Sequence, residues 1–332
     1  MNHNIISRNE RLQKVSEALP TLSGHILVVN DTTNALTHIE GTRWSIFSHE
    51  KIKGSPNPPT CEGGFDVAVV RLSTNKDQMK MMLSLLNGVL KENAPIWVVG
   101  CNDEGIKSFP KTAERFMNDV ETIDIRKRAR LLNGTRTSET TSFEEWIHNH
   151  SIELDGNSVE WKSVPGVFAK GQLDVGTQFL LDVLAAYPIK RTHQLADFAC
   201  GTGVIARWLA DRFPESQLDA MDADSWAMEM TKINAPTATH RLMDGWTGMP
   251  RDCRYDLVIS NPPVHIGKEQ DFTVLEGLIR DVKDRLHYRG QLLMVTQHHI
   301  PVQRLATEAE YRICEVVEHN KGYKVWRLAN HN

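Results

Sequence analysis

The second half of the sequence alternates short apolar segments with amphipathic ones, and this alternation constrains the fold more than any other feature. The apolar segments have the length of buried strands, and the segments between them carry apolar residues at helical spacing. Strands that alternate with helices predict an α/β fold with a doubly wound, mostly parallel sheet. We expect strands at 194–198, 217–221, 255–260 and 291–296, helices at 204–213, 225–234 and 272–286, and an antiparallel C-terminal hairpin that turns at 320–322.

The first half of the sequence repeats this pattern in a weaker form. Segment 65–72 (FDVAVVRL) reads like 255–262 (YDLVISNP), because each places an aromatic residue and an aspartate before a buried strand. Two further pairs of segments match in the same way, 94–100 with 290–296 and 25–31 with 194–200. The matches predict two tandem Rossmann-like domains, the first of them degenerate, with chance similarity between apolar strands as the alternative.

The polar stretch 133–142 (NGTRTSETTS) has the composition of a domain boundary. We therefore expect one domain at 1–140 and a second at 141–332. The first copy has no glycines after its opening strand, and residues 71–73 are Arg-Leu-Ser where the second copy has Asn-Pro-Pro. We expect the first domain to have no cofactor site.

Composition and residue spacing argue against several classes of protein, namely metal-binding, disulfide-stabilised and membrane-spanning proteins. Five scattered cysteines without a CxxC pair indicate neither a zinc site nor a disulfide framework, and the histidines His265, His298 and His299 lack partners at ligand spacing, so we expect no metal. No segment approaches the roughly 20 apolar residues of a membrane span, and the N-terminus lacks signal-peptide features. We expect a cytoplasmic monomer without a membrane partner. A net charge of -4 does not by itself indicate nucleic-acid binding.

The strongest functional signal is the loop after the predicted strand 194–198, within residues 197–203 (DFACGTG). Gly201 and Gly203 allow a sharp turn and a close approach of a ligand to the backbone, just before a helix N-terminus. No third glycine follows at dinucleotide spacing, which disfavours a pyrophosphate site. Asp222 follows the next strand, where a carboxylate can accept from ribose hydroxyls. Asp244 follows another strand and either accepts from an adenine amino group or is a loop aspartate.

A second motif, Asn261-Pro262-Pro263, directly follows the predicted strand 255–260. Two prolines fix the backbone and remove two donors, so the nearby carbonyls are available as acceptors. A planar NH2 group can donate to the Asn261 side-chain oxygen and the Pro262 carbonyl, which directs its lone pair at an electrophilic methyl group. Alignment and exclusion of water, rather than a strong base, would then supply the acceleration. A rigid turn without chemistry is the alternative.

In this order, the elements resemble the class I S-adenosylmethionine-dependent methyltransferases whose Asn-Pro-Pro-aromatic motif marks methylation of an amino or amide nitrogen. Within that group the chain resembles the ribosomal small-subunit RNA guanine-N2 methyltransferases, which have two tandem α/β halves with the first degenerate. The resemblance rests on residues 165–168 (PGVF), 173–178 (LDVGTQ), 197–203, 260–267 and 322–327 (GYKVWR).

The resemblance implies S-adenosylmethionine as the cofactor and the exocyclic N2 amino group of a guanine in 16S-type ribosomal RNA as the acceptor, with ribosomal RNA or the small ribosomal subunit as partner. It implies that the target amine is held by Asn261, Pro262 and Pro263. The cofactor-binding residues that it implies are Asp197, Ala199, Gly201, Gly203, Asp222 and Asp244. The substrate-binding residues that it implies are Val264, His265, Asp174, Thr177 and Lys324.

One departure concerns the acceptor. Val264 stands where the family has Phe or Tyr, whose ring stacks on the target base in a contact worth about 1–3 kcal/mol. Either Phe272 or Trp246 supplies a ring instead, or the acceptor differs. Two alternatives therefore stay open: methylation of adenine N6 or of a protein glutamine amide, and a non-catalytic ribosome-assembly factor on a methyltransferase scaffold.

Overall fold

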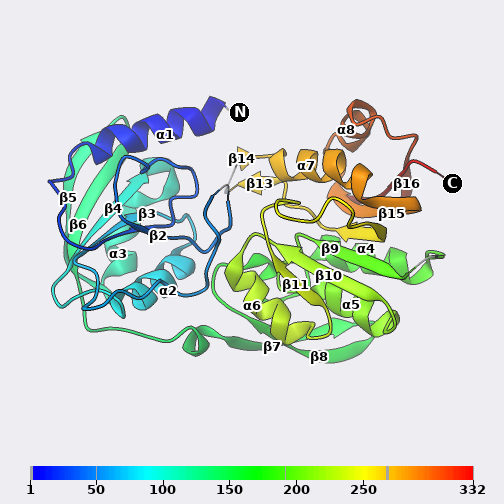
Figure 1. Ribbon diagram of the computed structural model, residues 1–332, viewed down its shortest axis with the longest axis horizontal. Helices are drawn as coiled ribbons and strands as arrows, with labels where there is room; N and C mark the ends of the chain where they lie inside the picture. Colours follow the sequence, from blue (N-terminus) through cyan, green and yellow to red (C-terminus); the bar gives the residue numbers. More distant parts are fainter. Residues whose placement is uncertain (1–2, 50, 191, 267–268, 332) are drawn as a thin grey trace. The chain divides into compact units, whose positions relative to one another are not determined.

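The computed structural model describes residues 3–49, 51–190, 192–266 and 269–331. The chain divides into two compact units, residues 1–147 and 148–332, called here the N-terminal and C-terminal units. Each unit contains its own central sheet with helices against it (Figure 1). The prediction of an α/β fold in two tandem copies is confirmed.

The C-terminal unit is built on a seven-stranded sheet with the order β11-β10-β9-β12-β15-β17-β16. Its first five strands in that order are parallel, and β17 and β16 form the antiparallel hairpin predicted at the C-terminus. The strands are β9 (Gln194–Phe198), β10 (Gln217–Asp222), β11 (Thr239–Leu242), β12 (Tyr255–Ser260), β15 (Leu286–Gln297), β16 (Ile313–His319) and β17 (Tyr323–Ala329).

Helices cover both faces of this sheet because successive strand residues point to opposite sides. Leu195 and Leu257 pack into one core with helices α4, α5 and α6, whereas Ala196 and Val258 pack into a second core with α7 and α8. These helices are α4 (Val175–Ala186), α5 (Val204–Arg212), α6 (Ser225–Asn234), α7 (Thr273–Val282) and α8 (Val302–Glu308).

The predicted helix 272–286 is too long. Helix α7 ends at Val282 and a single 3-10 turn follows, because Leu286 already pairs with Tyr255 in the sheet. The strand predicted at 291–296 is correspondingly longer, since β15 begins at Leu286. The short strands β13 (His265–Ile266) and β14 (Glu269–Gln270) lie before α7 and had no clear signal in the sequence.

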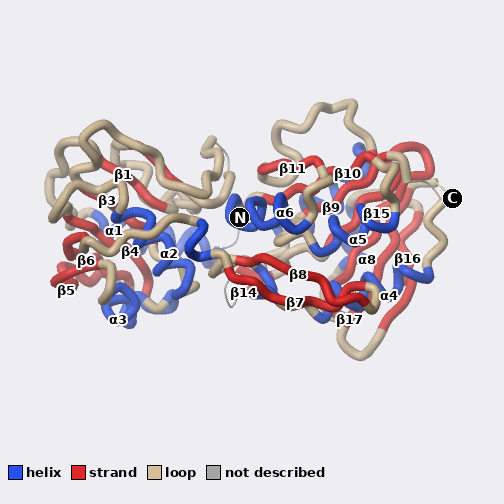
Figure 2. The backbone as a smooth tube through the Cα atoms, turned by 90° about the horizontal axis from the view of Figure 1, so that it is seen from below, coloured by secondary structure: helices blue, strands red, loops and turns tan. Residues whose placement is uncertain are grey.

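The C-terminal unit opens with a hairpin that precedes the main sheet. Strands β7 (His148–Leu154) and β8 (Asn157–Ser163) pair antiparallel over their full length, and Figure 2 shows them side by side. The indole of Trp161 on β8 is buried, and Asp155 in the hairpin turn accepts a hydrogen bond from Trp208 Nε1 on α5 at 3.0 Å. The hairpin is therefore part of the C-terminal unit rather than a linker.

The N-terminal unit has a six-stranded sheet with the order β2-β1-β3-β4-β6-β5. Its strands are β1 (Ile26–Val29), β2 (Thr42–Trp44), β3 (Val67–Arg71), β4 (Pro95–Cys101), β5 (Met117–Arg126) and β6 (Ala129–Arg136). Its helices are α1 (His3–Ser16), α2 (Lys76–Asn87) and α3 (Phe109–Ala113). Residues 133–136 belong to β6, and 133–135 pair with β4, so the polar stretch 133–142 begins inside the sheet rather than after it.

The two sheets repeat each other strand for strand apart from β11. In the N-terminal unit Ile26 pairs with Val67, and in the C-terminal unit Leu195 pairs with Leu257, which is the register that the matched sequence segments require. The left-handed backbone is repeated as well, with a φ of 60° at Asn30 and 57° at Ala199. Agreement in strand order, register and local backbone supports an internal duplication over chance similarity.

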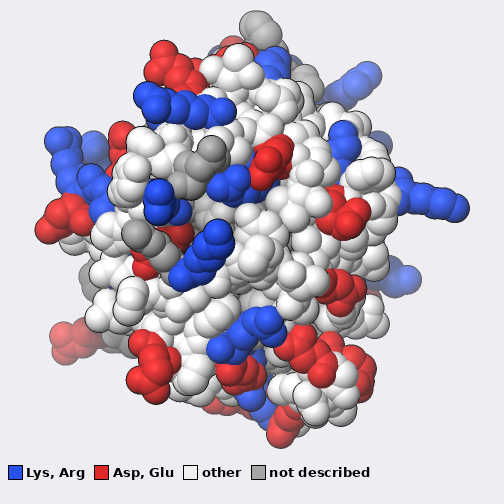
Figure 3. Space-filling model, turned by 90° about the vertical axis from the view of Figure 1, so that its right-hand side faces the viewer, with Lys and Arg blue, Asp and Glu red and all other residues white. Residues whose placement is uncertain are grey.

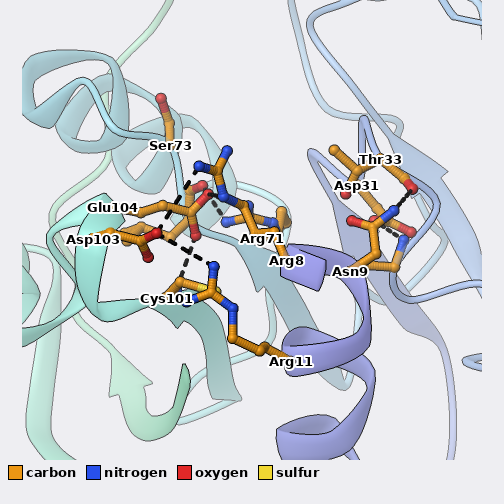
Figure 4. Close-up of polar contacts among 12 residues, drawn as sticks. Arg8, Asn9, Arg11, Asp31, Thr33, Arg71, Ser73, Cys101, Asp103 and Glu104 are labelled. Carbon is orange, nitrogen blue, oxygen red and sulfur yellow. Dashed lines mark hydrogen bonds and ion pairs between the residues drawn. The ribbon is translucent and has the colours of Figure 1, made fainter. Parts of the chain in front are cut away.

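The copies differ most where β3 ends. Arg71, the counterpart of Asn261, is buried and forms an ion pair with the buried carboxylate of Glu104. Glu104 also accepts from the backbone N–H of Cys101 at 2.9 Å and lies 3.6 Å from Arg8 Nε (Figure 4). Asp103 beside it pairs with Arg11 on α1 at 3.3 Å. An ion-pair network thus occupies the strand end that carries Asn-Pro-Pro in the second copy.

We predict that Glu104→Gln lowers the free energy of unfolding of the N-terminal unit by about 3–5 kcal/mol, because it leaves the buried guanidinium of Arg71 without its counter-charge. Urea unfolding of Glu104→Gln, Arg71→Met and the double variant measures this loss. The double variant should lose less than the sum of the single variants, since the second change removes the unpaired charge. Strict additivity would contradict the coupling.

Candidate active site

Two loops of the C-terminal unit begin side by side at the carboxyl edge of its sheet. Strands β9 and β12 are neighbours in parallel pairing, with Phe198 opposite Ser260. The Ser260 hydroxyl donates to the Phe198 carbonyl at 2.7 Å, which joins the two strand ends directly. The residues that follow them, 199–203 and 261–263, therefore start within one strand spacing of each other, about 5 Å.

The loop after β9 has an unusual backbone. Ala199, Gly201 and Gly203 have φ values of 57°, 55° and 91°, all in the left-handed region. Glycine adopts this region without steric cost, whereas an alanine pays roughly 1–2 kcal/mol for the contact of its Cβ with the backbone. The predicted turn is thus present, and Ala199 occupies a position where glycine would be relaxed.

Buried side chains from three elements hold this loop in place. Thr231 on α6 donates to the Gly201 carbonyl at 2.8 Å, and Asn234 on the same helix donates to the Thr202 carbonyl at 2.9 Å. Trp161 on β8 donates to the Thr202 hydroxyl at 3.1 Å. Asp197 lies fully buried beneath the loop and accepts from the Ala206 N–H at 2.8 Å. Neither Trp161 nor Asn234 stood out in the sequence, because their partners are distant in the chain.

The two glycines differ in the space around them. A Cβ on Gly203 would lie 2.9 Å from Thr231 Cγ2, so packing within the protein requires glycine there. A Cβ on Gly201 would meet only Phe168 Cβ, at 3.9 Å, and therefore has open space. Glycine at 201 leaves room above the backbone that none of the described residues fills.

Phe168 is a residue that the sequence reasoning did not select. Its side chain is 59% exposed although it lies beside Gly201, and it is followed by two left-handed non-glycine residues, Ala169 and Lys170. Strained backbone next to an exposed ring is typical of ligand-binding segments. The signal available in the sequence was its place in the stretch 165–168.

Acidic side chains line the same sheet edge. Asp222 ends β10, and its carboxylate accepts from the N–H groups of Gly201 at 2.8 Å and Asp224 at 2.9 Å. Asp224 caps α6, accepting from Trp226 N–H at 2.8 Å. Asp244 is exposed in the loop after β11, two strands from β9. The structure therefore brings Asp222 onto the glycine loop and leaves Asp244 at the rim of that edge.

Burial shifts the ionisation of these carboxyl groups. Loss of solvent raises the pKa of Asp197 well above its usual value, and it also raises the pKa of Asp222 despite three backbone N–H donors. Burial, with repulsion from Asp222, raises the pKa of Asp224 to about 7. Asp197 and Asp224 are buried and both lie close enough to Asp222 to be repelled by it, so the three carboxyl groups cannot all ionise at low cost.

The Asn261 side chain is fixed by two partners. Its Nδ2 donates to Asp174 Oδ2 at 3.0 Å and to Thr177 Oγ1 at 2.9 Å. Asp174 caps helix α4 by accepting from the Thr177 N–H at 2.9 Å. Pro262 is buried and Pro263 is exposed. The structure thus unites Asn261 with Asp174 and Thr177, three residues that the sequence reasoning had selected separately.

The remaining selected residues lie around this centre or apart from it. Val264 is half-buried against the core that includes Trp246, and the Trp246 ring is 8% exposed and lies 5.2 Å from the ring of Phe198. The side chain of His265 lies outside the described part of the structure. Lys324 on β17 lies over the ring of Trp326, with Nζ 5.5 Å from its centroid. Trp246 is therefore a core residue in this structure, and Phe272 is half-buried at the start of α7.

Comparison with known proteins assigns the family. The methyltransferase small domain model matches residues 158–327, and its N-terminal companion model matches residues 14–150. A Marinomonas protein named ribosomal RNA small subunit methyltransferase C is 31% identical over 242 residues, which cover 70% of this chain and 68% of that protein. The chain belongs to the methyltransferase small domain family.

Other members of the family match over nearly the full length. An Acinetobacter baumannii protein with the same name is 25% identical over 92% of this chain and 94% of its own. Among solved structures, a 16S rRNA N2 methyltransferase from T. thermophilus, solved in complex with AdoMet and guanosine, superposes with a TM-score of 0.80 at 16% identity and covers 96% of this chain and 91% of its own. The predicted resemblance and enzyme class, a methyltransferase, are confirmed.

Two features are absent from the described part of this methyltransferase small domain protein. Over the described residues, no group of three or more His, Cys, Asp or Glu side chains has the arrangement of a metal site. Within the same residues, the helices are too short or too polar to span a bilayer.

We predict that Gly203→Ala lowers the free energy of unfolding by about 2–5 kcal/mol, because it adds a clash with Thr231 to the cost of a left-handed alanine. Gly245→Ala is the matched control, since Gly245 has a φ of 56° and no described atom lies within 4 Å of an added Cβ. Gly201→Ala should resemble this control. Thermal and urea unfolding measure all three, and equal losses in Gly203→Ala and Gly245→Ala would show that the contact with Thr231 is unimportant.

We also predict that Asp224 makes stability fall as the pH rises from about 4 to about 7. The folded protein keeps this proton until about pH 7, whereas an unfolded aspartate releases it near 3.8, so the folded state binds more protons between those values. Asp224→Asn keeps the helix cap and removes the titration. Its melting temperature should exceed that of the wild type at pH 8 by more than at pH 4, and parallel pH profiles would refute the assignment.

Proposed function

We propose that the C-terminal unit is an S-adenosylmethionine-dependent methyltransferase that modifies the exocyclic N2 amino group of a guanine in 16S-type ribosomal RNA. The observation that carries the proposal is the Asn261 carboxamide, held at the strand end next to the glycine loop. The names of the relatives point to ribosomal RNA of the small subunit as the substrate, and the superposed T. thermophilus protein is named an N2 methyltransferase.

The glycine loop fits the cofactor. The open space above Gly201 suits a ligand that approaches the backbone closely, and Phe168 beside it offers an exposed apolar surface. The Asp222 carboxylate accepts from backbone N–H groups on both oxygens, and its remaining acceptor capacity suits a ribose hydroxyl. Ala199 and Gly203 would shape the loop, Asp197 would support it from below, and Asp244 would reach the adenine amino group.

The Asn-Pro-Pro turn would hold the acceptor. S-adenosylmethionine, when bound, supplies a sulfonium methyl group for attack by a nitrogen lone pair. Asn261 Oδ1 and the Pro262 carbonyl would each accept one N–H of the planar amino group, and the rigid turn would keep its lone pair aimed across to the neighbouring loop. The proton lost from the amine would leave through these acceptors to water. Pro263 would limit the freedom of the turn.

The RNA partner is supported by the relatives more than by the charge of the surface. Figure 3 shows Lys and Arg side chains interspersed with Asp and Glu on one face, rather than a field of one sign. Val264 cannot stack on a base as an aromatic residue would, and the Trp246 ring is buried in the core, so we assign this role to the half-buried ring of Phe272. His265 and Lys324 would contact the RNA around the acceptor. A ribosomal RNA substrate would place the protein in the cytoplasm, and we propose that it acts as a monomer.

The first domain, which we place at residues 1–140, would carry no cofactor. Residues 71–73 replace Asn-Pro-Pro, and the pair Arg71–Glu104 occupies the corresponding strand end. The loop after β1 has Asn30 and Asp31 where the C-terminal unit has Ala199 and Cys200. The Asp31 carboxylate accepts from the N–H groups of Ala35 and Leu36 at 2.8 and 2.9 Å and pairs with Arg43 at 3.4 Å. Catalysis would belong to residues 141–332.

We predict that Asn261→Ala lowers the rate of methyl transfer by about 100-fold or more and leaves S-adenosylmethionine affinity within about threefold, because Asn261 addresses the acceptor rather than the cofactor. Gly201→Ala should show the opposite split, with weaker cofactor binding. Tritiated-methyl transfer to small subunits, free ribosomal RNA and protein fractions measures the rate, and calorimetry measures the affinity.

The same assay separates the alternatives. Nucleoside analysis of the labelled RNA should yield N2-methylguanosine. Label in N6-methyladenosine or in protein would assign a different acceptor, and absence of S-adenosylmethionine binding would leave only a non-catalytic role.

A further inference from the structure

The side-chain amide of Asn261 has two possible orientations, one with its oxygen and one with its NH2 group toward the acceptor. With Oδ1 toward the acceptor, the side chain accepts from an amino group; with Nδ2 toward it, two donors face each other. Nothing in the Asn-Pro-Pro sequence selects one orientation, since the oxygen and nitrogen of an amide are nearly equal in size. A neighbouring group has to make the choice.

The carboxylate of Asp174 determines which orientation the amide adopts. An ionised carboxylate only accepts hydrogen bonds, so the Asn261 atom 3.0 Å from Asp174 Oδ2 has to be the NH2 group. The same Oδ2 accepts from the Thr177 N–H at 2.9 Å, which holds the carboxylate on the first turn of α4. Oδ1 of Asn261, by contrast, accepts no hydrogen bond from any side chain or backbone group that the structure describes.

Thr177 completes the arrangement. Its hydroxyl lies 3.4 Å from Asp174 Oδ2 and 2.9 Å from Asn261 Nδ2, so it donates to the carboxylate and accepts from the amide. Thr177 is 5% exposed, which removes water as a competitor for these bonds. Both N–H bonds of the Asn261 amide are thereby engaged on one side, and its oxygen is left for the other.

We infer that Asp174 and Thr177 are positioning residues that lock the Asn261 amide with its oxygen toward the acceptor amine, rather than residues that bind the substrate themselves. The inference rests on the proposed function for the identity of the acceptor, but the locked amide is a property of the protein alone. It explains why the first turn of α4 and the end of β12, which are far apart in sequence, carry matched polar groups.

Three variants separate positioning from a merely structural role. Asp174→Ser keeps a good helix cap, but serine is one atom shorter and neutral, so it loses the acceptor for Asn261. Thr177→Val keeps the shape of threonine and loses its hydroxyl, whereas Thr177→Ser keeps the hydroxyl. Asp182→Ser removes an exposed carboxylate from the same helix and serves as the control.

The expected result is a split between turnover and binding. Asp174→Ser should lower kcat by about 10- to 100-fold and Thr177→Val by about 3- to 10-fold, because a hydrogen bond to a charged group is the stronger of the two. Thr177→Ser should recover most of the kcat, and Asp182→Ser should match the wild type. S-adenosylmethionine affinity and melting temperature should stay close to the wild type in all four.

A second readout does not need activity. In protein labelled with 15N-asparagine, the side-chain NH2 signals of Asn261 are those that vanish in Asn261→Ala. They should exchange slowly with water in the wild type and Thr177→Ser, and at least tenfold faster in Asp174→Ser and Thr177→Val. Unchanged exchange in both, or a kcat equal to wild type in both, would overturn the inference. If the wild type methylated no RNA, the proposed function would fail while the exchange experiment would still decide the positioning.

Discussion

The parallel pairing of β9 with β12 is the contact on which the proposed site depends. Because parallel strands end at the same edge, the pairing of Phe198 with Ser260 puts the glycine loop and the Asn-Pro-Pro turn next to each other. The bond from the Ser260 hydroxyl to the Phe198 carbonyl then fixes their separation. The pairing of the two strands thus sets the distance between the loop and the turn. Asp222, which accepts from the loop, and Asp174, which accepts from Asn261, then fix the local orientation of each.

The duplicated sheets show how the same scaffold can keep or lose a site. Strand order, register and the left-handed residue after the first strand are shared, so the backbone that could support chemistry is present twice. One difference that bears on the site is the side chain at the end of β3 or β12. In the N-terminal unit, the guanidinium of Arg71 is paired with the buried carboxylate of Glu104 and needs no ligand. In the C-terminal unit, the side-chain oxygen of Asn261 remains available to accept a hydrogen bond from a ligand.

The strands of the C-terminal unit could be predicted well because their signal is local. Buried parallel strands are continuous apolar runs, and the glycine and proline residues that end them have fixed backbone requirements. The end of α7 could not be predicted, because it is set by the pairing of Leu286 with Tyr255, a contact between distant segments. The hairpin β7–β8 was missed for a different reason, because its short strands mix polar and apolar residues and give no clear strand signal.

The site residues divide in the same way, into those that a local sequence signal predicts and those that depend on contacts between distant segments. Gly201, Gly203 and Asn261 could be predicted from residue type and spacing, and the ends of β9 and β12, which these residues follow, do lie together. The supports of the site, among them Trp161, Thr231 and Asn234, carry no local signal, since each acts through a partner 30 or more residues away in the chain.

The hairpin β7–β8 bears on where the C-terminal unit can be cut. The family match begins at residue 158, inside the hairpin, but β8 is held by pairing with β7, and Trp161 on β8 reaches the Thr202 hydroxyl. A fragment that started at the edge of the family match would keep the tryptophan and lose the strand that aligns it. Residues from 148 onward are therefore needed for any shortened chain intended for crystallisation or ligand screening.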